Sequence, residues 1–193
     1  MNGGELVREL LAAGADLNAV DQYGAGALNY AAAEGNCGAI GEMIAAGLDP
    51  NERRKERELA MVVAARNGRV SVVRVLLEDG AEADGEAGTE SSPLIECLRR
   101  HYDEVARTLI EAGADVNRKG LEGATPLLCA LGYFDWFEYE RSRPPKANLE
   151  LIELLLDRGA DPGAESEHGQ TPLGLARAKR NTRLIGLIKR RMK

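Results

Sequence analysis

Long apolar runs and a targeting signal are both missing from this chain. No apolar stretch approaches the roughly 18 residues that a membrane-spanning helix needs. The first residues, MNGGELVREL, lack the basic and apolar regions of a secretory signal. We therefore expect a soluble, cytoplasmic protein that makes no membrane contact.

Cysteine and aromatic residues are also scarce. Cys37, Cys97 and Cys129 are an odd number without CxxC spacing, which argues against a disulfide framework and against a zinc site. We expect these cysteines to be small, reduced core residues, with no metal bound. Only eight of the 193 residues are aromatic, so Ala and Leu must fill most of the interior. This composition suits thin layers of closely packed short helices.

One pattern does recur along the chain: the apolar end of a helix followed by glycine. Successive copies are separated by 33, 33, 33 and 46 residues, and the marker glycines are Gly14, Gly47, Gly80, Gly113 and Gly159. Glycine ends a helix by adopting the left-handed conformation. A period of this length predicts a stack of small units, none of which buries its apolar face alone.

A second pattern marks the start of another helix in three units. Ser92-Pro93, Thr125-Pro126 and Thr171-Pro172 are each followed by Leu and an apolar turn. A hydroxyl group caps the free amides of a helix start, and proline at the first position has no amide to leave unbonded. We therefore predict helix pairs over 25–46, 59–79, 92–112, 125–158 and 171–191, with no regular sheet.

Three segments carry a likeness to a known family: DQYGAGALNYAA at 21–32, GATPLLCAL at 123–131 and HGQTPLGLA at 168–176. Together with the period, they resemble the ankyrin repeat. The resemblance implies an all-α ankyrin-repeat solenoid of stacked helix-turn-helix units with projecting loops. It divides a single domain, 1–193, into a half repeat at 1–16, full repeats at 17–50, 51–83, 84–116 and 117–162, and a C-terminal cap at 163–193.

The resemblance also implies where a partner binds: on the loop tips and on the inward face of the first helices, which form a concave groove. On that frame the candidate partner-binding residues are Tyr23, Lys55, Arg66, Arg99, Arg100, Tyr133, Trp136 and His168. The middle of this groove is basic although the chain carries a net charge of -6. We expect a protein partner with an acidic or phosphate-bearing segment, because guanidinium groups bind such anions well. The alternative is that these long charged side chains are only solvated and bind no partner.

The fourth repeat contains 13 additional residues, within Gly132 to Glu150. Five of the eight aromatic residues lie there, in the aromatic insertion at 133–147. Helical spacing places Phe134 and Phe137 on the apolar line of the preceding helix, so we predict that they pack inward. For Tyr133 and Trp136, partner contact and structural packing both remain open.

The C-terminal segment is basic, with eight Lys or Arg and no acidic residue from Arg177 to Lys193. We nevertheless expect no nucleic-acid binding, because the rest of the chain is acidic and no aromatic stacking platform accompanies this segment. Enzymatic activity is not expected either. His101 and His168 lie in units separated by a whole repeat, without an evident nucleophile beside them, and no cofactor motif is present.

Two non-catalytic classes of function remain. In the first, the protein is a monomeric adaptor or inhibitor that binds another protein. In the second, it is a structural module that self-associates through its first helix, where Leu6 and Leu10 lie, or a fragment of a larger ankyrin protein.

Overall fold

The computed structural model describes residues 3–51, 59–85, 92–134 and 147–192. Within these ranges the chain forms helices and no named strand, apart from an isolated antiparallel bridge between Val20 and Gly26. The helices are α1 (Gly3–Ala12), α2 (Ala27–Glu34), α3 (Cys37–Ala45), α4 (Ala60–Arg66), α5 (Val70–Glu78), α6 (Pro93–Arg99), α7 (Asp103–Glu111), the short 3-10 helix η1 (Leu121–Gly123), α8 (Pro126–Ala130), α9 (Leu149–Asp157), α10 (Pro172–Ala178) and α11 (Thr182–Arg191).

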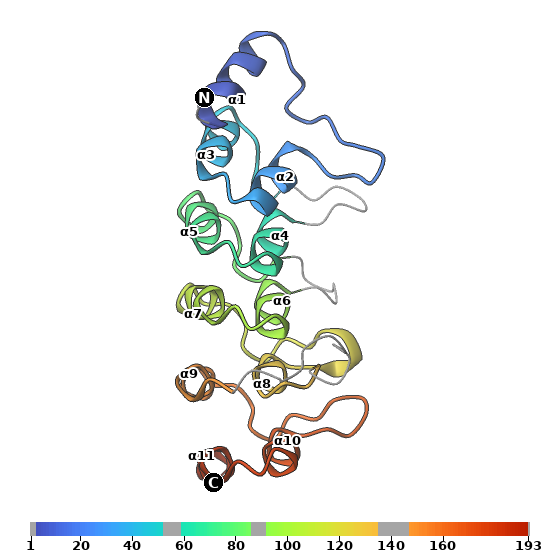
Figure 1. Ribbon diagram of the computed structural model, residues 1–193, viewed down its shortest axis with the longest axis vertical. Coiled ribbons are helices and arrows are strands. Elements are labelled where there is room, and N and C mark those ends of the chain that lie inside the picture. Colours follow the sequence, from blue (N-terminus) through green and yellow to red (C-terminus); the bar gives the residue numbers. More distant parts are fainter. Residues whose placement is uncertain (1–2, 52–58, 86–91, 135–146, 193) are drawn as a thin grey trace.

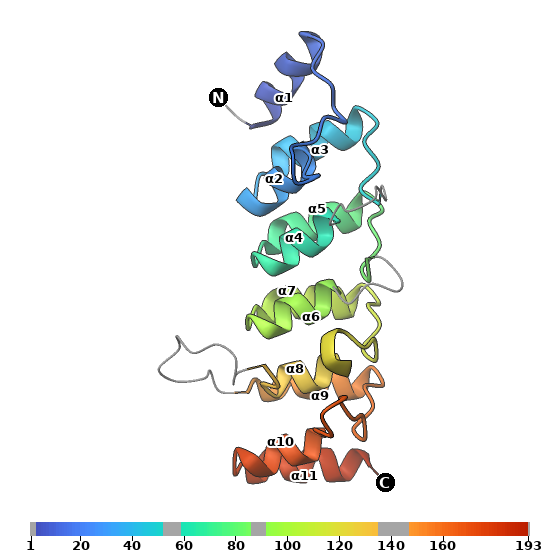
Figure 2. The same ribbon diagram turned by 90° about the vertical axis from the view of Figure 1, so that its right-hand side faces the viewer.

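The α-helices form two parallel rows (Figure 1). A first-helix row holds α2, α4, α6, α8 and α10, and a second-helix row holds α1, α3, α5, α7, α9 and α11. Each helix contacts its neighbours in its own row, and the two helices of each unit contact one another. Figure 2 looks onto the first-helix row, with the loops between units gathered near one end of its helices. The predicted all-α stack and its five helix pairs are confirmed.

All five marker glycines adopt the left-handed conformation that the sequence pattern predicts. Their φ angles lie between 86° at Gly14 and 100° at Gly47. A Cβ atom built on any of these glycines meets no other atom within 4 Å. Glycine is therefore required at these helix ends by backbone conformation and not by lack of space.

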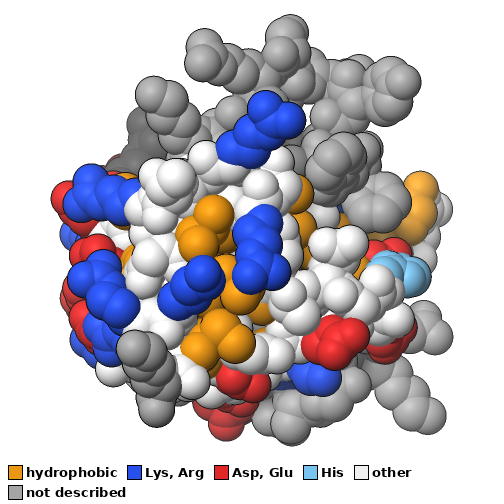
Figure 3. All heavy atoms as spheres, turned by 90° about the horizontal axis from the view of Figure 1, so that it is seen from below, with side chains coloured by type: hydrophobic (Ala, Val, Ile, Leu, Met, Phe, Trp, Pro, Cys, Tyr) orange, Lys and Arg blue, Asp and Glu red, His pale blue; other side chains and the backbone are white. Residues whose placement is uncertain are grey.

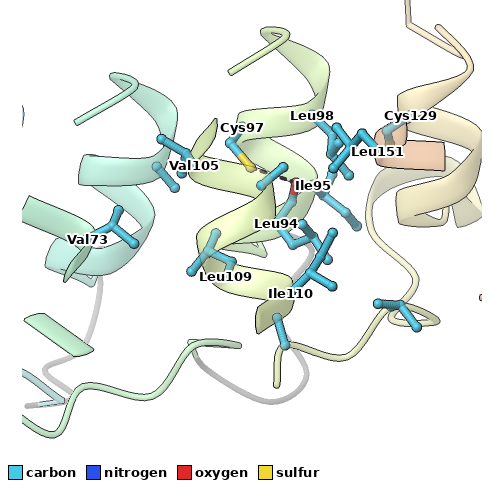
Figure 4. Packing of buried hydrophobic residues seen from close by; sticks show 14 of the residues in the cluster. Val73, Leu94, Ile95, Cys97, Leu98, Val105, Leu109, Ile110, Cys129 and Leu151 are labelled. Atoms are coloured by element: carbon cyan, nitrogen blue, oxygen red, sulfur yellow. Dashed lines mark hydrogen bonds between the residues drawn. The ribbon is translucent and has the colours of Figure 1, made fainter. Parts of the chain in front are cut away.

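The core is a continuous apolar layer between the two rows. Figure 4 shows Leu94, Ile95 and Leu98 of α6 near α7 side chains and Leu151 of α9, and all four are buried. Removing each such side chain from water stabilises the fold by roughly 1.5–3 kcal/mol. Cys97 and Cys129 are buried free thiols, as predicted, and burial raises the pKa of both.

An asparagine after a marker glycine connects consecutive units. The Asn51 side-chain amide donates to the carbonyl oxygen of Gly80 at 2.9 Å, and its side-chain oxygen accepts from the amide of Glu82 at 2.8 Å. Asp84, one period later, accepts from the amide of Asp115 at 2.6 Å. These bonds hold the loops of neighbouring units at a fixed spacing.

Two of the three predicted hydroxyl caps are present. The side chains of Thr125 and Thr171 accept from the amides of Leu128 at 3.4 Å and Gly174 at 3.1 Å. The prediction for Ser92 is wrong. Ser92 directly precedes α6 in an extended conformation, but its hydroxyl does not cap the helix and is buried without a hydrogen-bond partner among the described residues.

The two ends of the stack differ in surface character. On α1, Leu6 and Leu10 are exposed. At the opposite end, formed by α10 and α11, apolar side chains lie among Lys and Arg side chains (Figure 3). These helices carry the partly buried Leu173 and Ile185. In the part of the chain that the structure describes, no helix has both the length and the apolar character to span a bilayer.

Candidate partner-binding surface

Three of the predicted binding residues lie at the carboxyl ends of consecutive first helices. Arg66 is the last residue of α4, Arg99 is the last residue of α6, and Arg100 follows it directly. Arg66 and Arg99 are one period apart and therefore occupy the same position in successive units. Because α4 packs beside α6, stacking brings the three guanidinium groups together.

The three arginines converge on one carboxylate, that of Glu96 in α6. Arg66 Nε binds Glu96 Oε2 at 3.0 Å, Arg100 Nη1 binds the same oxygen at 2.7 Å, and Arg99 Nη1 binds Oε1 at 3.3 Å. Glu96 is only 6% exposed, whereas the arginine side chains are 32–33% exposed. We refer to Glu96, Arg66, Arg99 and Arg100 as the arginine cluster. It carries two net positive charges, and sequence reasoning identified its arginines but not Glu96.

The fold itself does not require a charge at the Glu96 position. The residues at this position in the other units are Tyr30, Val63, Cys129 and Leu175. A carboxylate with so little exposure is costly to bury unless charged partners and hydrogen bonds compensate. Glu96 is therefore best explained by its bonds to the arginines, which it holds in a fixed arrangement.

Two aromatic rings extend the arginine cluster toward the next unit. The Arg99 guanidinium lies 4.4 Å from the centroid of the Phe134 ring, within cation–π range. Phe134 and Tyr133 are in edge-to-face contact with centroids 4.9 Å apart. Phe134 is buried, which confirms the prediction that it packs inward. Tyr133 is only 5% exposed, which favours packing over direct partner contact for this ring.

A polar contact then links Tyr133 to the fifth unit. The Tyr133 hydroxyl donates to Glu122 Oε2 at 3.5 Å, and His168 Nε2 lies 3.6 Å from the same oxygen. Glu122 adopts a left-handed conformation in η1, with φ of 58°, and its carbonyl accepts from the amide of Glu167 at 2.9 Å. The exposed His168 side chain is thus placed beside the tip of the fourth loop.

The first full unit presents two exposed tyrosines. Tyr23, at the predicted loop tip, is 79% exposed. Tyr30 of α2, which sequence reasoning missed, is 56% exposed, and its hydroxyl donates to Asp21 Oδ2 at 2.5 Å. This bond raises the pKa of Tyr30 and lowers the pKa of Asp21. Tyr30 occupies the same position in its unit as Glu96 does in the third, and the sequence analysis selected neither residue.

Comparison with protein families agrees with this architecture. A family model described as ankyrin repeats matches in three copies, over residues 1–86 and 28–120. These matches cover more than half of the chain. The chain is an ankyrin-repeat protein. A comparison with curated proteins gave no match.

The predicted binding residues of this ankyrin-repeat protein fall into separate groups. Arg66, Arg99 and Arg100 are brought together by Glu96, while Tyr133 and His168 meet at Glu122. Tyr23 lies apart from both groups, in the first full unit. Lys55, Trp136 and Phe137 lie outside the described residues. Chemically, the surface offers guanidinium donors for anions and exposed phenol rings for apolar contact.

Proposed function

We propose that this ankyrin-repeat protein is a non-catalytic interaction module, an adaptor or an inhibitor, that binds a partner protein across its first-helix row and loop tips. Ankyrin repeats generally mediate protein–protein interaction. The observation that carries the proposal is the convergence of three arginines from two consecutive units on one buried carboxylate. An acidic segment of the partner lies along this surface.

The geometry of the arginine cluster favours recognition over plain solvation. A solvated arginine is free to move, whereas Arg99 is held by Glu96 on one side and by the Phe134 ring on the other. Restricting the side chain before binding lowers the entropy lost when a partner binds. Positive charge at this place also steers an acidic segment toward a chain whose net charge is -6.

We assign the aromatic insertion to the same partner-binding surface, where Trp136 makes apolar contact with the partner. Tryptophan is enriched among the residues that dominate binding energy. We expect Trp136→Ala to weaken the partner by about 2 kcal/mol or more. If the variant instead loses thermal stability and keeps its affinity, the insertion only packs on itself.

The test begins with affinity capture of a partner, followed by dissociation constants for the purified pair. The double variant Arg99→Gln/Arg100→Gln removes two guanidinium groups from the surface. Arg74→Gln is the matched control, because Arg74 pairs with Glu104 on the second-helix row. We expect at least about tenfold weaker binding for the double variant, most clearly at low salt, and little change for the control. An equal loss of affinity in the double variant and in Arg74→Gln would contradict the proposal.

A second candidate function is self-association, which the exposure of Leu6 and Leu10 on α1 favours. Exposed leucines on one helix offer apolar area to a second copy of the chain. Sedimentation velocity at micromolar concentration tests this function. A dimer that is lost in Leu10→Glu would support self-association. A monomeric chain would favour the binding of a partner protein.

A further inference from the structure

We propose that the arginine cluster is a binding site for a phosphomonoester dianion carried by a segment of the partner protein. This inference rests on the proposed function and specifies the chemical group that the first-helix row recognises. It follows from three observations: the donor groups that remain available, the net charge of the cluster, and its compactness.

The first observation concerns hydrogen-bond donors. Arg99 and Arg100 both use Nη1 to bind Glu96, and Arg100 Nη1 also approaches the Glu96 carbonyl oxygen at 3.4 Å. Among the residues that the structure describes, the Nε and Nη2 hydrogens of these two arginines have no protein acceptor. A guanidinium group has five N–H donors in a planar fork, so each side chain retains several for a ligand.

The second observation concerns charge. Arg99 and Arg100 share the single negative charge of Glu96, so positive charge remains on these two guanidinium groups. Cys129, which takes the Glu96 position in the next unit, does not cancel this charge. Burial raises the pKa of this thiol to about 12, so it stays neutral. A phosphomonoester, with about -1.5 to -2 charges at neutral pH, attracts this pair of guanidinium groups more strongly than the single charge of a carboxylate does.

The third observation concerns size. Arg66 and Arg100 bind the same oxygen atom of Glu96, and Arg99 binds the other oxygen of that carboxylate. The guanidinium groups thus surround one small region and are not spread along the row. A phosphate group presents three acceptor oxygens within a comparably small volume, while a run of carboxylates places its charges on separate side chains.

Three probes distinguish the ligand classes at neutral pH and low salt. They are the peptide acetyl-Gly-phosphoSer-Gly-amide, the peptide acetyl-Gly-Glu-Gly-amide and inorganic phosphate. The measurement is the change in ¹H–¹⁵N shifts of arginine Nε–Hε groups during titration of the full chain. We expect the phosphoserine peptide to shift the signals of Arg99 and Arg100. Its dissociation constant should be about tenfold or more below those of the other two probes.

Variants connect the signal to the site. Arg99→Gln/Arg100→Gln should lower the affinity for the phosphoserine peptide at least about tenfold, and Arg74→Gln should leave it unchanged. Arg99→Lys/Arg100→Lys preserves the net charge and replaces the glutamine double variant if that variant fails to fold. It should still weaken binding of the phosphoserine peptide, because lysine lacks the planar fork of donors of a guanidinium group.

Four results would overturn the inference. Equal affinity for the phosphoserine and glutamate peptides would indicate a general carboxylate site, and the proposed function would stand. Inorganic phosphate binding as tightly as the peptide would indicate a site for the free ion. An unchanged affinity in the lysine pair would indicate a simple charge effect. If no probe shifts these arginines, the cluster only connects the second and third units.

Discussion

The side-chain amide of Asn117 donates to the carbonyl oxygen of Gly159 at 2.8 Å, across the segment that contains the 13 additional residues. Its side-chain oxygen accepts from the amide of Asp161 at 2.8 Å. Asn51 makes the equivalent pair of bonds two units earlier. The contact between these loops therefore has the same form with and without an insertion.

Replacement of Asn117 tests the importance of these loop contacts. Asn117→Ala removes both bonds, and we expect the free energy of unfolding to fall by about 1–2 kcal/mol. Urea denaturation followed by circular dichroism measures the change. Asn51→Ala should have a similar effect. If Asn117→Ala has no effect while Asn51→Ala destabilises, the contact across the insertion carries no stability.

Ser92 and Thr171 both directly precede a helix, but only the Thr171 hydroxyl caps its helix, so the two positions can be compared directly. Thr171→Ala removes the bond to the amide of Gly174 and should cost about 1 kcal/mol. Ser92→Ala removes a buried hydroxyl that has no hydrogen-bond partner in the described part of the chain, so this variant should be neutral or stabilising. Thermal melts of the two variants check this order, and a larger loss for Ser92→Ala would refute it.

Two residues other than glycine occupy left-handed positions after first helices. His101 and Arg180 have φ of 60° and 51°, where Gly35 and Gly68 stand in other units. Relief of this strain should make Arg180→Gly more stable by up to about 1 kcal/mol. Arg183→Gly is the control, because glycine within α11 should destabilise by about 1 kcal/mol. Chemical denaturation tests the opposite signs, and destabilisation by Arg180→Gly would contradict the argument.

Local stability should decrease from the middle of the stack toward its ends. Six residues of α6, Pro93 to Leu98, are buried, whereas only Gly4 of α1 is buried. Because units contribute through their nearest neighbours, a terminal helix has fewer stabilising contacts. Amide hydrogen exchange should be slowest in α6 and fastest in α1. Equal protection of the two helices would argue for fully cooperative unfolding instead.

The helix pairs and their glycine ends were predictable because their signals are local. A glycine or a Thr-Pro pair acts within a few residues of its own position. The role of Glu96 was not predictable, because it depends on how α4 stacks beside α6. The packing of Tyr133 likewise depends on contacts with Phe134 and Glu122, which lie in the tertiary structure. Ser92 had the right residue type for a cap but the wrong side-chain placement.

The position of the insertion has a consequence for how such a protein diversifies. The additional residues separate α8 from α9 within one unit, while the Asn117 contact between loops keeps the form of the Asn51 contact. Lengthening a loop destabilises the fold only slightly, since each doubling of the loop length costs roughly 0.6 kcal/mol in closure entropy. Segments of different length and sequence can therefore be exchanged at this point beside Arg99 and Phe134. Such exchange would alter partner choice while the rest of the chain keeps its architecture.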